Sequence, residues 1–243
     1  MDVQIFGLIK FCVRRLPMDA GWIMHQTKPA GAEWRPVLPI SLSKFDSTAI
    51  VKKGRRGQEI SSQCAEAGYI FFVVAGLARK FAIQPDGHRR IVNLLLPGDI
   101  VSLDGGLEEA FFLEAAVDNT VIAGYTRSRI EELIAADPNF GREVQKMVLQ
   151  SLSRLERQLL ILGRITAVEK VAGFLLEFAG RLSNDKSNSI TLPITRYDIA
   201  DFIGISSETV CRCMTELTRR GAIALPRPRE VKIVDRSILE DMD

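Results

Sequence analysis

Histidine and cysteine are scarce in this chain of 243 residues, and their scarcity excludes several kinds of site. The only histidines, His25 and His88, cannot form an HExxH motif or a His-x-His pair for a catalytic metal. The cysteines are too few and too irregularly spaced for a disulfide framework: Cys12, Cys64, Cys211 and Cys213. We therefore expect no metal site, no cofactor and no catalytic residues, so the chain is not predicted to be an enzyme.

Long apolar runs and a large net charge are also missing. No run reaches the roughly 18 residues of a membrane span. Near the N-terminus, Lys10, Arg14 and Arg15 follow the apolar part, which is the wrong order for a secretory signal. We expect a cytoplasmic protein with no membrane partner. Because 32 basic residues against 30 acidic ones leave a charge of only +2, any binding to nucleic acid needs a local basic patch.

The composition, 47% hydrophobic and 26% charged, is typical of a globular protein. Residues 1–45 contain four prolines and are predicted to form an irregular arm, partly disordered. From residue 46 the pattern changes to short apolar runs with turns about every ten residues, such as Pro85-Asp86-Gly87 and Pro97-Gly98-Asp99. This spacing predicts a β-sandwich or jelly roll, and we assign residues 46–137 to that domain.

A helical period begins near Ser128, and a long helix is predicted within 138–163. Its apolar residues are spaced 4, 4, 3, 4 and 3, which is nearly a heptad repeat and favours pairing with a second copy of the helix. Burial against the chain's own β-domain is the alternative. The residues of this predicted dimer interface are Val144, Val148, Leu152, Leu155, Leu159 and Leu162.

Residues 164–243 contain the pattern of a winged helix-turn-helix. Thr195 and Asp198 form a Thr-x-x-Asp capping pattern that starts a first helix. Gly204 stands where a tight turn needs a positive φ, and Ser206 can cap a second helix. The apolar segment Val231–Val234, preceded by several arginines, is expected to form the β-hairpin wing.

In this arrangement the exposed N-terminal half of the second helix faces the bases in the major groove. Arginine can bridge the O6 and N7 atoms of guanine, and glutamate can accept from cytosine. We therefore expect base-reading by Ser207, Glu208, Cys211 and Arg212, and phosphate contacts by Thr195, Arg196 and Thr209. The alternative is that Glu208 and Arg212 form an ordinary ion pair, four residues apart on a solvated helix, with no role in DNA binding.

The chain resembles the CRP/FNR transcription regulators, in particular their FixK-like branch, over roughly residues 47–240. The motifs that carry the resemblance are Leu162–Leu176, Leu192–Asp201 and Ser207–Arg212. The resemblance implies an α+β fold with an N-terminal β-roll of the cyclic-nucleotide-binding type, a long dimerisation helix and a C-terminal winged helix. It also implies a homodimer in which Glu208 and Arg212 read an inverted repeat of TTGA-type half-sites in double-stranded DNA. Bound protein of this kind usually activates transcription by recruiting RNA polymerase.

The sensor region departs from the family pattern. The stretch Asp104–Phe112 has no arginine for a cyclic-nucleotide phosphate, and Glu108 and Glu109 would repel one. The isolated cysteines cannot supply four thiolates to an iron–sulfur cluster. We therefore favour a regulator that does not depend on cyclic AMP. A regulator gated by haem or another small ligand is the alternative, and a cupin-type enzyme is disfavoured because metal-binding histidines are missing.

Cys211 is a candidate redox switch, because the resemblance places it on the DNA face, where FixK- and FNR-like proteins usually have serine. Oxidation of its thiol would add bulk and negative charge opposite the DNA. Cys213 lies about 200° further around the helix and should face inward, away from Cys211. The alternative is that Cys211 is a small, tolerated replacement for serine.

Overall fold

The computed structural model describes residues 48–60, 68–103, 111–182, 189–227 and 230–242. The expected N-terminal arm and Cys64 lie outside these residues. Most of residues 104–112, on which the expected independence from cyclic AMP is based, also lie outside them. The chain divides into two compact units. Residues up to Ala82 together with Leu94–Ser151 form the first unit, and Ile83–Asn93 with Leu152–Asp243 form the second.

The strands of the β-domain build two sheets, as the β-branched and aromatic content of segments such as Tyr69–Val74 predicts. A four-stranded sheet has the order β1-β7-β2-β5, and a three-stranded sheet has the order β4-β3-β6. Neighbouring strands of the larger sheet pair antiparallel throughout. The strands are β1 (Ile50–Gly54), β2 (Tyr69–Ala75), β3 (Ala78–Ile83), β4 (Arg89–Leu95), β5 (Ile100–Ser102), β6 (Phe111–Ala115) and β7 (Thr120–Thr126).

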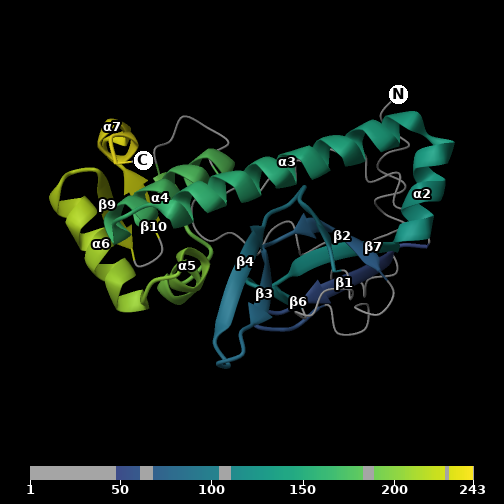
Figure 1. Ribbon diagram of the computed structural model, residues 1–243, viewed down its shortest axis with the longest axis horizontal. Helices are drawn as coiled ribbons and strands as arrows, with labels where there is room; N and C mark the ends of the chain where they lie inside the picture. The colour runs from purple at the N-terminus through teal and green to yellow at the C-terminus, as the bar shows by residue number, and fades with distance from the viewer. Residues whose placement is uncertain (1–47, 61–67, 104–110, 183–188, 228–229, 243) are drawn as a thin grey trace. The chain divides into compact units, whose positions relative to one another are not determined.

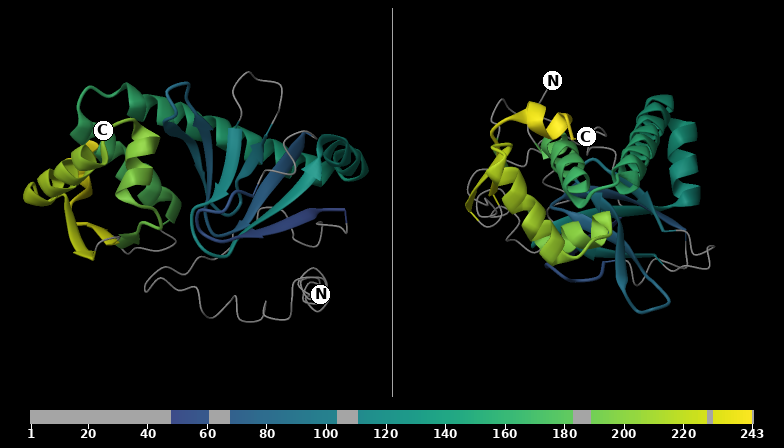
Figure 2. Two further views of the ribbon diagram at one scale, coloured as in Figure 1. Left: turned by 90° about the horizontal axis from the view of Figure 1, so that it is seen from below. Right: turned by 60° about the vertical axis from the view of Figure 1, so that its left-hand side comes forward.

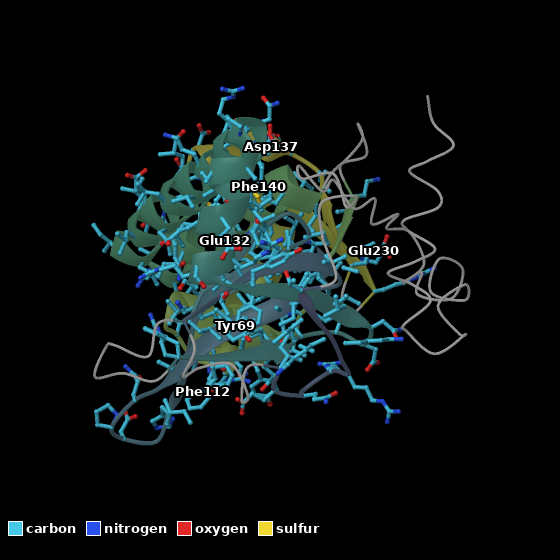
Figure 3. The ribbon with its side chains drawn as sticks, turned by 90° about the vertical axis from the view of Figure 1, so that its right-hand side faces the viewer. Tyr69, Phe112, Glu132, Asp137, Phe140 and Glu230 are labelled. Atoms are coloured by element: carbon cyan, nitrogen blue, oxygen red, sulfur yellow. The ribbon has the colours of Figure 1, made fainter. Side chains whose placement is uncertain are left out.

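Strand β2 is apolar on both faces, because each face contributes to a different core. Phe71 and Val73 belong to a cluster shared with residues of both sheets, including Leu95 and Leu113. Phe72 belongs to a second cluster with residues of two helices, α2 (Arg127–Ala136) and α3 (Pro138–Gly163). Figure 3 shows Phe140 of α3 above the strand that carries Tyr69.

Helix α3 is a single helix of 26 residues that begins at Pro138, where proline is well tolerated in the first turn (Figure 1). The start of this helix, which belongs to the first unit, packs on strands of the β-domain through Phe140, Val144 and Met147. Val144 is 8% exposed and is therefore buried within its own chain. For this residue the structure agrees with the alternative prediction, burial against the chain's own β-domain. Further along, Val148, Leu152, Leu155 and Leu159 are exposed, whereas Ile161 is buried.

The second unit contains the helices α4 (Ala167–Leu182), α5 (Arg196–Ile203), α6 (Ser207–Arg219) and α7 (Arg236–Glu240), and a small sheet (Figure 2). Rings of Phe174 and Phe178 stack at 4.5 Å between centroids, and Phe202 of α5 meets both edge-on. This aromatic cluster fixes α5 against α4. The sheet has the order β8-β10-β9, with β8 (Ser189–Thr191), β9 (Ile223–Arg227) and β10 (Glu230–Ile233).

The expected fold class, a β-rich domain followed by a long helix and a winged helix-turn-helix, is confirmed. Strand β1 and helix α7 were not expected. The sequence of β1, Ile-Val-Lys-Lys-Gly, has too few apolar residues to stand out, and its strand conformation comes from pairing with β7 over five residues. Within the described residues, no helix is both long and apolar enough to cross a membrane.

Candidate nucleic-acid interface

The first helix of the helix-turn-helix begins with a complete capping box. The Thr195 hydroxyl accepts from the Asp198 amide at 3.2 Å, and the Asp198 carboxylate accepts from the Thr195 amide at 2.9 Å. The reciprocal bonds satisfy two amides that a helix start would otherwise leave without partners. The predicted start of this helix is therefore confirmed.

Gly204 ends α5 in the left-handed conformation, with φ 72° and ψ 44°. A side chain is strained at this φ, whereas glycine adopts it freely. Two residues later, the Ser206 hydroxyl accepts from the Thr209 amide at 3.1 Å and caps α6. The turn and both caps follow the sequence prediction, so the ends of the two helices at this turn can be read from local residue types.

Helix α6 is strongly two-sided. Its inner face consists of Val210, Met214 and Leu217, which are each no more than 1% exposed. Of the expected base-reading residues, Glu208, Cys211 and Arg212 are exposed, and Ser207 is half-buried. The helix thus presents a polar surface at its N-terminal half while its opposite face anchors it in the domain.

Glu208 and Arg212 form an ion pair on this surface. The Arg212 Nη2 atom donates to Glu208 Oε1 at 2.5 Å, and the two side chains are 77% and 73% exposed. An ion pair this exposed contributes little to stability. Its structural effect is to orient the guanidinium, with one carboxylate oxygen and the remaining N–H groups still available.

The expected phosphate-contacting residues are less exposed than the base-reading ones. Thr195 and Thr209 are half-buried, and their hydroxyls already bond to Asp198 and Ser206. Arg196 is also half-buried, and burial lowers the pKa of its guanidinium, while the nearby Cys211 thiol acts in the opposite direction. A guanidinium that is partly desolvated in this way gains more from an anionic partner than a fully hydrated one.

Tyr197 was not among the expected site residues. It is 70% exposed on the first turn of α5, directly after Arg196. The phenolic hydroxyl of an exposed tyrosine can donate to a phosphate oxygen. A bulky aromatic residue among polar neighbours at a capped helix start is the sequence signal that could have identified it.

The arginines near the wing are paired with acidic side chains of the same domain. Glu216 accepts from Arg219 Nη2 at 2.8 Å and from Arg220 Nε at 2.7 Å, and these bonds lower the pKa of Glu216 to about 2. The Arg227 Nε atom lies 3.7 Å from the Glu230 Oε2 atom across the wing. The positive charge near the wing is thus partly balanced by these acidic side chains, while Arg229 lies outside the described residues.

The two cysteines of α6 have opposite surroundings. Cys211 is exposed and Cys213 is buried, as the helical spacing predicts. Burial raises the pKa of the Cys213 thiol, because the thiolate would be poorly solvated. Only Cys211 of this pair is therefore open to an oxidant from solution.

Four of the six residues expected at a dimer interface form an exposed apolar row on α3. Val148, Leu152, Leu155 and Leu159 are between 38% and 68% exposed, and Leu162 is half-buried. Leu149 and Leu160, which the heptad pattern does not include, widen the row. This row is an unusual amount of exposed leucine for one helix.

Comparison with known proteins agrees with this architecture. Residues 169–242 match the model of the Crp-like helix-turn-helix domain. The nitrogen fixation regulation protein FixK of Rhizobium meliloti is 31% identical over 217 residues, which cover 89% of this chain and 97% of that protein. The transcriptional activator protein FnrL of Cereibacter sphaeroides is 32% identical over 80% of each chain. The solved structure of FixK2 from Bradyrhizobium japonicum superposes with a TM-score of 0.69 at 32% identity, covering 80% of this chain and 97% of that one.

These relatives are themselves transcription regulators, and they align with this chain over most of their length. The similarity agrees with the capped helices, the glycine turn and the wing described above. The chain belongs to the CRP/FNR family of transcription regulators, within its FixK-like branch, and it is a DNA-binding regulator and not an enzyme.

Proposed function

We propose that the protein is a homodimeric activator that binds an inverted repeat of TTGA-type half-sites without cyclic AMP and recruits RNA polymerase to the promoter. The observation that carries the proposal is the Glu208–Arg212 pair on the exposed N-terminal half of α6. An oriented guanidinium can bridge guanine, and its carboxylate partner can accept from cytosine. The protein would act in the cytoplasm, where the DNA of bacteria lies.

Dimer formation is supported by the leucine row of α3. The exposed residues Val148, Leu152, Leu155 and Leu159 have a spacing suited to a parallel partner helix. A two-fold dimer brings two copies of α6 into successive major grooves about 34 Å apart. This symmetry is why an inverted repeat is the expected target.

Independence from cyclic AMP is supported by the sequence of residues 104–112, which has no arginine and two adjacent glutamates. A cyclic-nucleotide phosphate needs a cation or several amide donors in its pocket, and the glutamates would repel it. Binding to DNA is therefore expected at full strength in purified protein to which no nucleotide has been added.

Redox control through Cys211 is the final part of the proposal. Peroxide would oxidise the thiol to a sulfenic acid with release of water, and a second equivalent would give a sulfinate. A sulfinate here would be a negative charge within electrostatic range of Arg196, where it would compete with a DNA phosphate. Oxidation should therefore weaken binding.

The test is fluorescence anisotropy with a palindromic TTGA-type duplex and a scrambled duplex, at fixed salt because phosphate contacts make affinity salt-dependent. Reduced and peroxide-treated protein are compared, and Cys211→Ser is the matched variant. Specific binding only by reduced wild type, together with peroxide-resistant binding by Cys211→Ser, supports the full proposal. Specific binding in both states would rule out redox control but leave the DNA target. Absence of specific binding in either state would overturn the proposed target.

Recruitment of RNA polymerase is tested separately by transcription in vitro from a promoter that carries the same duplex sequence. We expect transcripts to increase on addition of the reduced protein. A decrease would identify a repressor at that promoter.

A further inference from the structure

Two neighbouring arginines, at the start of β4, contact the helix-turn-helix. Residues Ile83–Asn93 belong to the same compact unit as α5 and α6. The Arg89 guanidinium donates to Asp201 Oδ2 from Nε at 3.3 Å and from Nη2 at 3.1 Å. Its Nη2 atom also lies 3.4 Å from Asp198 Oδ1. One arginine therefore bonds to two carboxylates of α5.

Asp198 links this arginine to the start of the helix. Its Oδ2 atom accepts from the Thr195 hydroxyl at 2.8 Å and from the Thr195 amide at 2.9 Å, while Oδ1 faces Arg89. The residue is only 2% exposed. Removal of a cation from a buried carboxylate is costly, so Arg89 should affect Asp198 more than an exposed ion pair would.

The second arginine lies against the turn. A Cβ atom at Gly204 would be 2.4 Å from Arg90 Nη1 and 2.7 Å from Nη2. The Arg90 guanidinium thus lies close against Gly204, where the positive φ favours glycine. The start of β4 contacts both α5 and the turn that leads to α6.

We propose that Arg89 is a positioning residue for DNA binding, an inference that rests on the proposed function. Arg89 neutralises Asp198 and Asp201, two carboxylates on the helix whose N-terminus carries the expected phosphate contacts Thr195 and Arg196. It also holds Asp198 in the geometry that caps α5. Arg89 acts through these carboxylates and does not itself contact DNA.

The first experiment reverses the charges of the pair. Arg89→Glu should lower affinity for the specific duplex about tenfold, a typical size for coupling between contacting charged residues. The double variant Arg89→Glu/Asp201→Arg should recover most of that loss. Arg236→Glu is the matched control, because Arg236 forms an exposed pair with Glu240 on α7, and its affinity should stay close to wild type. Thermal unfolding tests whether each variant is folded. If Arg89→Glu is not folded, Arg89→Gln is used in its place.

Salt dependence distinguishes positioning from direct contact. Loss of a phosphate contact lowers the slope of log K against log salt by about 0.9. We expect an unchanged slope for Arg89→Glu. A reduced slope with no recovery in the double variant would overturn the positioning role, because Arg89 would then itself contact DNA.

Amide hydrogen exchange of the full chain without DNA provides a readout that does not depend on the proposed target. Arg89→Glu should speed exchange of residues 195–204, and the double variant should restore protection. Unchanged exchange together with unchanged affinity would overturn the inference. If wild type bound no specific duplex, the proposed function would fail while the exchange comparison still decided the role of Arg89.

Discussion

At the scale of residues, Arg212 and Arg196 carry the same charge in different surroundings, and this difference predicts different roles. Arg212 is 77% exposed and held by Glu208. We expect Arg212→Ala to weaken specific binding by about 1–3 kcal/mol and to relax the preference for guanine at one position of each half-site. Anisotropy titrations with single-base variants of the duplex measure both effects.

The matched control for Arg212→Ala is Arg236→Ala, which removes an arginine from a similar exposed pair on α7. It should leave the sequence preference unchanged. Equal losses by Arg212→Ala on specific and scrambled duplexes would show that Arg212 does not read bases.

Arg196 is half-buried at the start of α5, beside Cys211. Because a phosphate contact carries no sequence information, Arg196→Ala should weaken binding to all duplexes alike. It should also lower the salt slope by about 1. Titrations at several salt concentrations test this, and a loss confined to the specific duplex would contradict it.

The sequence was sufficient to predict the roles of those residues whose roles depend on local spacing. Thr195, Gly204 and Ser206 lie within one short motif, so their capping and turn roles follow from residue type and separation. The partial burial of Arg196 depends on packing and could not be predicted. The contact of Arg89 with Asp201 joins residues 112 apart, and nothing in a local pattern indicates it.

At the scale of elements, α3 is predicted to hold the dimer together through its exposed leucines. Leu152 is 52% exposed near the middle of the row. Leu152→Glu places a charge in each copy at the expected contact, which should shift the protein to a monomer and reduce binding to the inverted repeat. Sedimentation velocity measures the change in mass.

Ser153→Glu is a suitable control for this substitution, since Ser153 is also exposed on α3 but lies outside the apolar row. It should remain dimeric. A dimeric Leu152→Glu protein would show that another surface joins the two copies.

The end of α6 should make stability depend on pH in the acid range. Hydrogen bonds from Arg219 and Arg220 lower the pKa of Glu216 from 4.5 to about 2. Because the pKa is lower in the folded state, the stabilisation is present above about pH 4.5 and is lost as the pH falls towards 2. Glu216→Gln should therefore reduce the melting temperature at pH 6 and differ less from wild type at pH 3. An equal difference at both pH values would contradict this account.

Elements were predictable to the extent that their own residues encode them. Helix α4 (Ala167–Leu182) is encoded by its own residues, because its apolar face is clear in the sequence and a polar segment follows it. Strand β1 depends on its neighbour β7, so only the paired structure reveals it. The same reasoning applies to Val144, whose place in the heptad stripe does not show that it packs on its own β-domain.

At the scale of the whole molecule, two-fold symmetry links the helix pair to the spacing of the DNA target. If two copies of α6 enter successive major grooves, the half-site centres must lie about one helical turn apart, near 10 base pairs. Insertion of five base pairs between the half-sites turns the second half-site to the opposite side of the duplex. Affinity should then fall to that of a duplex with one half-site, as measured by anisotropy at the same salt.

The control for this insertion is a substitution of the same central base pairs without a change in length. It should alter affinity much less, because α6 is not expected to contact these base pairs. The monomeric Leu152→Glu variant should bind the normal and the lengthened duplex equally, because it uses one half-site at a time. Equal affinity of wild-type protein for both duplexes would mean that the two recognition helices are not held at a fixed separation, and the homodimeric arrangement proposed from α3 would be wrong even if each half-site were read correctly.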